Sequence, residues 1–486
     1  MALKAALEEI SSRQVEIPLV IGGREIRTGN LGKVVMPHQH QHVLGGYHKA
    51  GPEEVQRAID AAVAAQADWE KFRWEERAAI FLKAADLLAL KYRSKMNACA
   101  MLNGGKTAFQ AEIDAACELI DFLRFNVHYA QEIYQKQPES SPGVWNYVQH
   151  RPLEGFVFAV TPFNFTAIAG NLPTAPAIMG NTVVWKPASS LVYTPWLFMQ
   201  ILEEAGLPPG VINFVPGSGP DVGDTCLADP NLAGVHFTGS TRVFQQMWKT
   251  IGGNIDRYKA YPRIVGETGG KDFVFAHSSA DADALVTALV RGAFEYQGQK
   301  CSAASRAYIP ASLWPAVQSG LKTEMGSICM GPPTDFRNFV GAVIDQSAFD
   351  SITAYIDFAN ENEGGEVIIG GGYDDSEGYF IEPTVIRVSD PHFKTMVEEI
   401  FGPVLSIFVY DDEQFEETLS LCDSSSMYAL TGAVFSQDRR ATSAALARLE
   451  HSAGNFYIND KPTGAVVGQQ PFGGGRASGP NDKAGS

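Results

Sequence analysis

A cysteine among small residues is the first place where this sequence could carry chemistry. Cys301 stands in EYQGQKCSAASR, between Lys300 and Ser302 and three positions after Gly298. A thiol attacks as the thiolate, so it needs a lowered pKa, an approachable backbone and a donor for the oxyanion that it creates. The small neighbours give access, and Lys300 would favour the thiolate. Taken alone, the segment favours a buried structural cysteine over a nucleophile.

A carboxylate before two glycines is the second candidate. Glu267 lies in VGETGGKDF, at the end of a β-branched run and just before Gly269 and Gly270. The glycines allow close approach of the backbone, and a partly buried carboxylate with a raised pKa can act as a general base. The segment alone favours a surface glutamate before a loop.

A side-chain amide between two aromatic rings is the third candidate. Asn164 lies between Phe163 and Phe165 in AVTPFNFTAI, after an apolar run that predicts a buried strand. A buried amide needs a partner, or it offers its NH2 group to a ligand. An Asx turn beside Pro162 explains the residue equally well.

Three further segments have features of a nucleotide site. Residues 215–223, VPGSGPDVG, resemble a phosphate-binding turn, but their spacing is GxGxxxG and no acidic residue is evident at the end of the next strand. Gly239 and Ser240 follow a predicted strand, where Ser240 could cap a helix whose amides accept a phosphate. Lys186 ends the predicted strand VVWKPAS, where ligands collect in parallel sheets. Each segment alone fits a tight turn or a solvated lysine.

Helices are expected first along the chain. Apolar residues recur at i, i+3 and i+4 over residues 53–102, as two helices, and over 106–134, as a third. Residues 136–153 combine proline, serine and alternating aromatic residues, which predicts a loop and a β-hairpin.

From Phe156 onward, short apolar runs alternate with helical stretches. This alternation predicts parallel strands joined by helical crossovers, the doubly wound α/β arrangement. A second α/β region is expected over residues 268–452, with strands at DFVFA, SRAYIP, VIIGGG, VLSIFVY and LTGAVFS. The glycine-rich residues 453–486 are expected to be loop.

Composition excludes several classes of protein. The 486 residues are 45% hydrophobic, and 38 basic against 55 acidic residues give a formal charge of −17. This balance disfavours nucleic acid and anionic membranes as partners. The six cysteines show no CxxC and no histidines at metal-ligand spacing, so we expect reduced thiols and no metal. The first residues contain no apolar run of signal-peptide length, which predicts the cytoplasm, or the mitochondrial matrix if a presequence has been removed.

Seven ordered segments, taken together, change these individual readings. TPFNF, WKP, FTGS, GETGGK, GQKCSA, EEIFGPV and NFYIND with PFGG resemble the aldehyde dehydrogenase superfamily across nearly the whole chain. The resemblance implies a nicotinamide-binding doubly wound domain, an α/β catalytic domain and a small β oligomerisation element. The implied boundaries are 1–135 with 154–267 for cofactor binding, 136–153 for an oligomerisation hairpin, 268–452 for catalysis, and 453–486 for a return segment with a substrate-anchor loop.

The resemblance also implies roles for single residues. Cys301 would be the nucleophile, Glu267 the general base, and Asn164 with the Cys301 backbone amide the oxyanion hole. The residues implied at the cofactor are Thr161, Lys186, Gly239, Ser240, Glu399 and Phe401. Those implied at the substrate are Phe165, Ser302, Ala477 and Ser478.

The most specific resemblance is to the branch of this superfamily that oxidises glutamate γ-semialdehyde to glutamate in proline degradation. Residues 110–126, 153–171, 293–306 and 454–483 carry it, including the loop GRASGPNDK, which looks like a carboxylate anchor. The alternatives are another ω-semialdehyde dehydrogenase or, against the presence of Glu267, a CoA-acylating enzyme. NAD is expected over NADP, although Ser189 stands where many relatives have an acidic residue.

The same resemblance bears on assembly. Relatives continue past the anchor loop with a strand used in dimer contacts, so we expect that C-terminal strand to be missing here. A small-molecule substrate and a homodimer or higher homo-oligomer are the expected partners, without nucleic acid or membrane.

Overall fold

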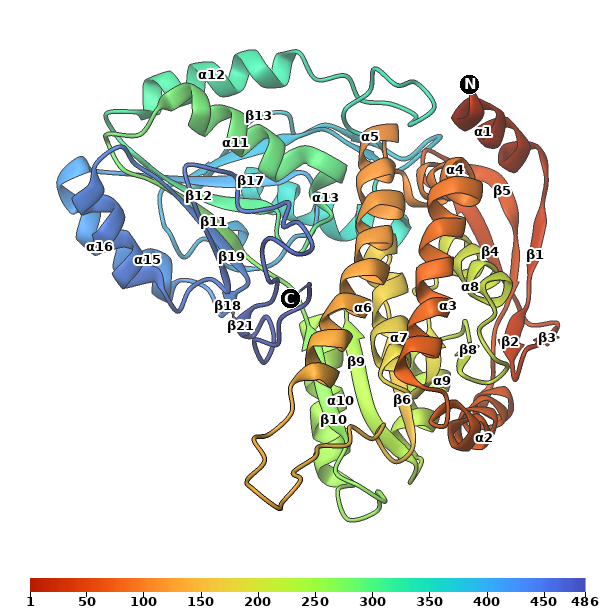
Figure 1. Ribbon diagram of the computed structural model, residues 1–486. Coiled ribbons are helices and arrows are strands. Elements are labelled where there is room, and N and C mark those ends of the chain that lie inside the picture. Colours follow the sequence, from red (N-terminus) through yellow and green to blue (C-terminus); the bar gives the residue numbers. More distant parts are fainter. Residues whose placement is uncertain (486) are drawn as a thin grey trace.

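A computed structural model describes residues 1–485, and two seven-stranded sheets dominate it (Figure 1). The first sheet has the order β10-β9-β6-β7-β8-β2-β3. Its strands from β10 to β8 are parallel, whereas β2 and β3 run antiparallel at one edge. The strands are β2 (Leu19–Ile21), β3 (Arg24–Ile26), β6 (Phe156–Val160), β7 (Thr182–Lys186), β8 (Ile212–Phe214), β9 (Leu232–Thr238) and β10 (Arg263–Glu267).

Helices cover both faces of this sheet, because its central strands are apolar on both faces. Phe156 and Phe158 of β6 belong to the core under α2, α9 and α10, whereas Val157 and Ala159 belong to the core under α7 and α8. The helices are α2 (Pro52–Trp69), α7 (Thr166–Ile178), α8 (Tyr193–Ala205), α9 (Gly219–Ala228) and α10 (Thr241–Gly253). The predicted doubly wound arrangement is confirmed.

The expected helices of the first 135 residues form, with two π-helical interruptions. The elements are α1 (Ala2–Ser12), α3 (Trp74–Leu87), η1 (Leu88–Tyr92, π), α4 (Arg93–Gly104), α5 (Ala108–Ala111), η2 (Glu112–Glu118, π) and α6 (Leu119–Gln135). A three-stranded sheet of β1 (Val15–Ile17), β5 (Gln39–His48) and β4 (Leu31–Met36) was not predicted.

The second sheet has the order β13-β16-β17-β12-β11-β19-β20, with only β13 antiparallel. Its strands are β11 (Asp272–Ala276), β12 (Ala304–Pro310), β13 (Gly365–Ile369), β16 (Thr384–Val388), β17 (Val404–Tyr410), β19 (Thr431–Phe435) and β20 (Asn455–Ile458). Short strands pair as β14 (Tyr373–Asp374) with β15 (Phe380–Ile381), and β18 (Tyr428–Ala429) with β21 (Gly475–Arg476).

Two helix layers enclose the second sheet (Figure 1). One core lies under α11 and α12, and the opposite core under α13, α15 and α16. The helical elements are α11 (Ala282–Phe294), η3 (Glu295–Gly298, 3₁₀), α12 (Trp314–Gly326), α13 (Gln346–Glu361), α14 (Lys394–Val397), η4 (Asp412–Gln414, 3₁₀), α15 (Phe415–Ser424) and α16 (Arg439–Leu449).

The hairpin expected at 136–153 is wrong for this chain. Every residue of that segment is described, and the structure places no strand between α6 and β6. The segment is an exposed loop (Figure 1) in which Val148 N–H donates to Gln137 Oε1 over 2.9 Å. Pro138 and Pro142 cannot donate ladder hydrogen bonds, which opposes regular pairing here.

The glycine-rich residues 453–486, expected to be loop, contain a strand of the second sheet. This strand, β20, pairs in parallel with β19 from Asn455 to Ile458. The apolar alternation in NFYI is short, and the glycines around it obscured it in the sequence. In residues 1–485, no helix combines the length and apolar character needed to cross a membrane.

Candidate active site

Cys301 and Glu267 meet between the two sheets. Glu267 is the last residue of β10 in the first sheet, and Cys301 lies between η3 and β12 of the second. The Cys301 thiol donates a hydrogen bond to Glu267 Oε1 over 3.2 Å. Two segments far apart in the sequence therefore place a thiol in contact with a carboxylate, as expected for a nucleophile and its base.

Burial sets the protonation of this pair. It raises the pKa of Glu267 to about 7, against the opposing effect of the thiol hydrogen bond. Burial also raises the pKa of the Cys301 thiol well above its ordinary value, and the neighbouring Glu267 carboxylate raises it further. The thiol therefore stays protonated at neutral pH until a base removes its proton, and Glu267 is the base in contact.

Lys300 does not act as sequence reasoning suggested. Its Nζ lies 3.0 Å from Glu295 Oε2, and both side chains are buried. The pair neutralises the lysine charge beside Cys301, so Lys300 is a poor source of thiolate stabilisation.

A strained turn holds the nucleophile. Tyr296, Gln297 and Gly298 have consecutive positive φ angles of 52°, 56° and 64°. Two non-glycine residues in this region cost about 1–3 kcal/mol each, so the surroundings must hold them. Gln297 Nε2 donates to the carbonyl oxygens of Gly105 over 3.1 Å and of Ala342 over 2.8 Å.

Asn164 lies at the same turn. It follows β6 and precedes α7, is buried, and donates from Nδ2 to the Gln299 carbonyl over 3.1 Å. One amide N–H is thus used to fix the side chain, and the second is available for an oxyanion. In the part of the chain that the structure describes, the Asn164 side chain makes no hydrogen bond of the Asx-turn type considered from the sequence.

Glu399 marks the expected cofactor side of the site. Its Oε1 accepts a hydrogen bond from Gly270 N–H over 3.0 Å. A Cβ at Gly269 would lie 2.1 Å from Glu399 Oε2, so only glycine lets the carboxylate lie against this linker. Burial raises the pKa of Glu399 to about 7. Phe401, with φ of 61°, packs edge-to-face on Phe163 at 5.8 Å between ring centroids.

The other expected cofactor residues lie at the carboxyl ends of the first sheet. Lys186 ends β7, and burial lowers its pKa to about 8. Ser240 occupies the N-cap position of α10 without a side-chain cap bond, and Gly239 N–H donates to the Glu267 carbonyl over 3.3 Å. The Thr161 hydroxyl accepts from Trp185 Nε1 over 3.0 Å, a structural contact.

The four expected substrate residues are only partly available. Ser302 shares a 2.7 Å hydrogen bond with the Thr463 hydroxyl. The Ser478 hydroxyl is buried and accepts from Ala429 N–H over 3.1 Å, whereas its carbonyl accepts from Thr268 N–H over 2.9 Å. The Ala477 carbonyl accepts from the Thr268 hydroxyl. The anchor loop therefore lies beside the residue that follows Glu267. The ring centroid of Phe165, the fourth residue, lies 4.6 Å from Lys106 Nζ.

Sequence reasoning missed several residues of this site. Thr463 lies in the glycine-rich return segment, and no motif singled it out. Partly buried Glu118 lies on η2, where burial raises its pKa to about 8, with nearby Asp114 and Glu267 raising it and Lys106 and Lys300 lowering it. The helical periodicity of residues 106–134 predicted a helix but could not show which polar side chains face a distant loop.

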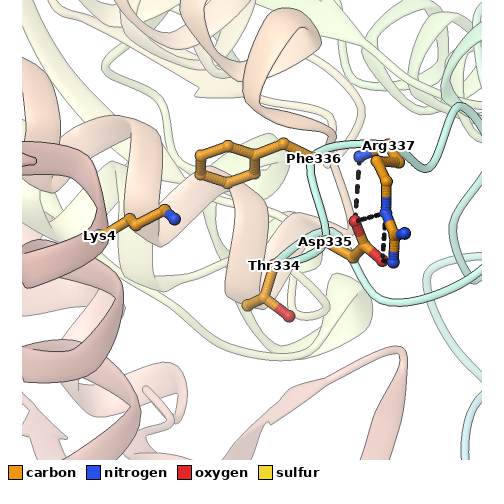
Figure 2. A pocket seen from close by; sticks show the side chains of 5 residues that line it. All are labelled: Lys4, Thr334, Asp335, Phe336 and Arg337. Carbon is orange, nitrogen blue, oxygen red and sulfur yellow. Dashed lines mark hydrogen bonds and ion pairs between the residues drawn. The ribbon is translucent and has the colours of Figure 1, made fainter.

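A surface hollow of about 470 Å³ lies apart from this centre (Figure 2). Its lining residues are Lys4, Thr334, Asp335, Phe336 and Arg337. Arg337 Nε donates to Asp335 Oδ1 over 2.9 Å, so its charge is already paired. The hollow contains none of the expected site residues. Within residues 1–485, no three histidine, cysteine or acidic side chains are grouped to hold a metal ion.

The family model described as "Aldehyde dehydrogenase family" matches residues 27–486. The chain belongs to the aldehyde dehydrogenase family. A relative from Dictyostelium discoideum, named delta-1-pyrroline-5-carboxylate dehydrogenase, mitochondrial, is 55% identical over 100% of this chain and 87% of its own. The human protein of the same name is 49% identical over 100% of this chain and 86% of its own.

A solved structure of this family extends the likeness to the fold. The Delta-pyrroline-5-carboxylate dehydrogenase from Mycobacterium tuberculosis, bound with NAD, has a TM-score of 0.96 and 54% identity, and the match covers 100% of this chain and 89% of that chain. The expected aldehyde dehydrogenase fold and family are confirmed.

Proposed function

We propose that the protein oxidises L-glutamate γ-semialdehyde to L-glutamate with NAD, as a step of proline degradation. The observation that carries the proposal is the contact between the Cys301 thiol and Glu267, with the Asn164 amide bound to the turn that precedes Cys301. The substrate is supported by the relatives, whose names identify delta-1-pyrroline-5-carboxylate as their substrate. That cyclic imine opens with water to the semialdehyde.

The residues at the site divide the chemistry into two stages. Glu267 takes the proton from Cys301, and the thiolate attacks the aldehyde carbon to form a thiohemiacetal. The oxyanion accepts a hydrogen bond from Asn164, a donor whose loss typically costs about 3 kcal/mol, or roughly a hundredfold in rate. After hydride loss leaves the thioester, Glu267 releases the thiol proton to solvent and then removes a proton from water. This water attacks the thioester carbon, and breaking the C–S bond releases glutamate and the Cys301 thiolate, which takes up a proton again.

Two side chains of this site are suited to binding NAD. The carboxylate of Glu399 lies against a glycine linker that no Cβ could share, and Lys186 lies buried at the carboxyl end of β7. We propose that these two residues hold the ribose hydroxyls, with Gly239 and Ser240 at the pyrophosphate and Phe401 at the nicotinamide ribose. Bound NAD supplies the acceptor for the hydride that the thiohemiacetal carbon loses.

We propose that Ser302, Ala477 and Ser478 hold the substrate carboxylate and that Phe165 lines the aliphatic part of the site. Ser478 would act through its hydroxyl hydrogen, because its backbone N–H already donates to the Gly475 carbonyl, whereas the hydroxyl oxygen only accepts from Ala429 N–H. The Ser302 hydroxyl, now shared with Thr463, would turn to the carboxylate.

Assembly and location are separate parts of the proposal. The loop 136–153 exposes 81% of Trp145 and 60% of Tyr147. An apolar patch of this kind supports a homodimer or higher homo-oligomer built through this loop. The relatives from Dictyostelium and human are named mitochondrial, which supports the matrix as an alternative to the cytoplasm.

Substrate competition tests the activity. Rates of NADH formation with glutamate γ-semialdehyde, succinate semialdehyde and propanal should rank in that order in kcat/KM, without dependence on added coenzyme A. A preference for propanal would overturn the substrate, and CoA-dependent product would overturn the hydrolytic route. Cys301→Ser should abolish the NADH burst in the same assay.

A further inference from the structure

Lys106 and Asp114 form a buried ion pair near the candidate site, and neither residue has a role in the proposed reaction steps. Lys106 Nζ is 3.1 Å from Asp114 Oδ2, and the two side chains are 1% and 2% exposed. This distance makes an ion pair, although Nζ is not aligned as a hydrogen-bond donor. A buried pair adds little net stability on average, so its contacts are the informative feature.

Asp114 caps the helix that follows Asn164. Its Oδ2 accepts from Thr166 N–H and its Oδ1 from Ala167 N–H, each over 2.9 Å. These are the first two residues of the thirteen-residue helix α7, whose N-cap residue, Phe165, offers no side-chain cap bond. A carboxylate at this end also opposes the positive end of the helix dipole. Asp114 therefore fixes the backbone two residues after the oxyanion donor.

Lys106 touches the turn that carries the nucleophile. Its Nζ lies 4.0 Å from the ring centroid of Tyr296 and 4.6 Å from that of Phe165. The Tyr296 hydroxyl donates to the Gly104 carbonyl over 2.8 Å, two residues before Lys106 in the chain. A desolvated cation is attracted to the electron-rich face of an aromatic ring. The lysine thus lies between the strained turn before Cys301 and the residue after Asn164.

The π-helical segment supports a dedicated role for Asp114. Asp114 is the third residue of η2, Glu112–Glu118, where the helix departs from the α-helical repeat. Such segments are rare and occur frequently at functional sites, because they redirect side chains within a helix.

We propose that Lys106 and Asp114 form a positioning pair that aligns the Asn164 amide with the Cys301 sulfur during acylation. The pair touches neither reacting atom and acts through α7 and the Tyr296 turn. This role rests on the proposed functions of Asn164 and Cys301. It applies to any aldehyde that the enzyme oxidises, because it concerns the oxyanion and not the substrate chain.

A double-mutant cycle tests the pair. Lys106→Met should lower the single-turnover rate of NADH formation roughly 10- to 100-fold, because small misplacement of a reacting group has effects of this size. In an Asn164→Ala background, the same Lys106→Met change should lower the rate less than about threefold, because the donor that it positions is gone. Equal losses in both backgrounds would overturn the proposal.

A matched control separates positioning from folding. Arg93 and Glu112 form an ion pair between α4 and η2, the helical segments that carry or directly precede the two residues of the buried pair, and both side chains are 39% exposed. Arg93→Met should leave the rate unchanged. Asp114→Asn, which keeps the shape and one oxygen acceptor, should slow acylation with an unchanged Kd for NAD, and it serves as the second variant if Lys106→Met does not fold. Full-rate acylation in Asp114→Asn would refute the role.

The assay uses whichever aldehyde the wild-type enzyme oxidises fastest. If the wild type reduces NAD with propanal and not with glutamate γ-semialdehyde, the proposed substrate fails while the cycle remains measurable. If the wild type works and the cycle is additive, only the positioning role fails.

Discussion

The Cys301 thiol donates to Glu267 Oε1 over 3.2 Å, across the junction between the two sheets. We propose that this one carboxylate serves both proton transfers, from the thiol before attack and from water after oxidation. No residue adjacent to Cys301 in the sequence could supply the first transfer. A base shared between two steps must recover its ionised form between them, and a pKa of about 7 for Glu267 suits that alternation.

The pH dependence of turnover should report Glu267. Because burial raises its pKa to about 7, the carboxylate is protonated and inactive as a base below that pH and ionised above it. We expect kcat/KM to rise with pH, with a midpoint near 7, and to be roughly tenfold lower at pH 6 than at pH 8. Steady-state rates in buffers of constant ionic strength measure this.

Glu267→Gln should remove both proton transfers. The amide cannot take the thiol proton, so we expect the NADH burst to slow as well as deacylation to stall, each by about a hundredfold or more. Stopped-flow absorbance of NADH separates the two phases. A burst of wild-type rate would show that another base serves Cys301.

The ribose contact of Glu399 should make NAD affinity depend on pH. Burial raises the pKa of Glu399 to about 7, so the acceptor carboxylate is lost as pH falls through that value. We expect the Kd for NAD to rise from pH 8 to pH 6 and not to rise in Glu399→Gln, whose Kd should be roughly tenfold higher at pH 8. Protein fluorescence quenching measures NAD binding without turnover, so the proton transfers proposed for Glu267 do not contribute to the signal.

The sequence predicted the central strands well because parallel strands covered on both faces are continuous apolar runs. β6 and β7 lie where FVFAV and TVVWK indicated them. β20 and the sheet of β1, β4 and β5 were missed, since their strands are short or interrupted by glycine. The hairpin at 136–153 was predicted from alternating aromatic residues and turn-forming prolines and serines, but in the described structure these residues form no strand.

The candidate site residues were singled out by their residue types, but only the family resemblance gave them roles, because each segment alone also fitted a structural reading. Their partners were not predicted. Asp114, which caps a helix fifty-two residues later, has no recognisable pattern in the sequence. Its contact depends on how α7 packs on η2. Helical periodicity predicts which face of a helix is buried, but not which residue of another element contacts that face.

Gly298 should be irreplaceable in the turn before the nucleophile. Its φ is 64°, and a Cβ there would lie 2.2 Å from the Gly402 carbonyl oxygen. We expect Gly298→Ala to destabilise the protein by about 2–4 kcal/mol and to lower activity more than tenfold, because the turn must shift and Cys301 with it. Urea denaturation and kcat measure the two effects.

Gly252 provides the matched substitution. It lies in α10 with an ordinary φ, and a Cβ added there would meet no atom within 4 Å. Gly252→Ala should be neutral or stabilising by up to about 1 kcal/mol. If both alanine substitutions destabilise the protein equally, the loss in Gly298→Ala cannot be due to the conformation of the turn.

His38 should make the contact between the two halves of the chain sensitive to acid. It lies buried in the turn between β4 and β5, where Tyr379 N–H donates to the Pro37 carbonyl over 3.0 Å from the other half. Burial lowers the pKa of His38 to about 4, and the nearby His42 lowers it further. Between its ordinary pKa of 6.5 and about 4, the unfolded chain takes up a proton that the folded chain does not.

Stability from His38 is therefore complete above pH 6.5 and falls as pH drops toward 4, by up to about 3 kcal/mol. His38→Gln cannot titrate, so its deficit in unfolding free energy at pH 7 should shrink at about pH 4.5. Urea midpoints at the two pH values measure this, with His451→Gln, at a side chain 84% exposed, as the control expected to follow the wild type. Parallel acid sensitivity in His38→Gln and the wild type would exclude His38 as the titrating group, because the loss would then come from carboxylates common to both.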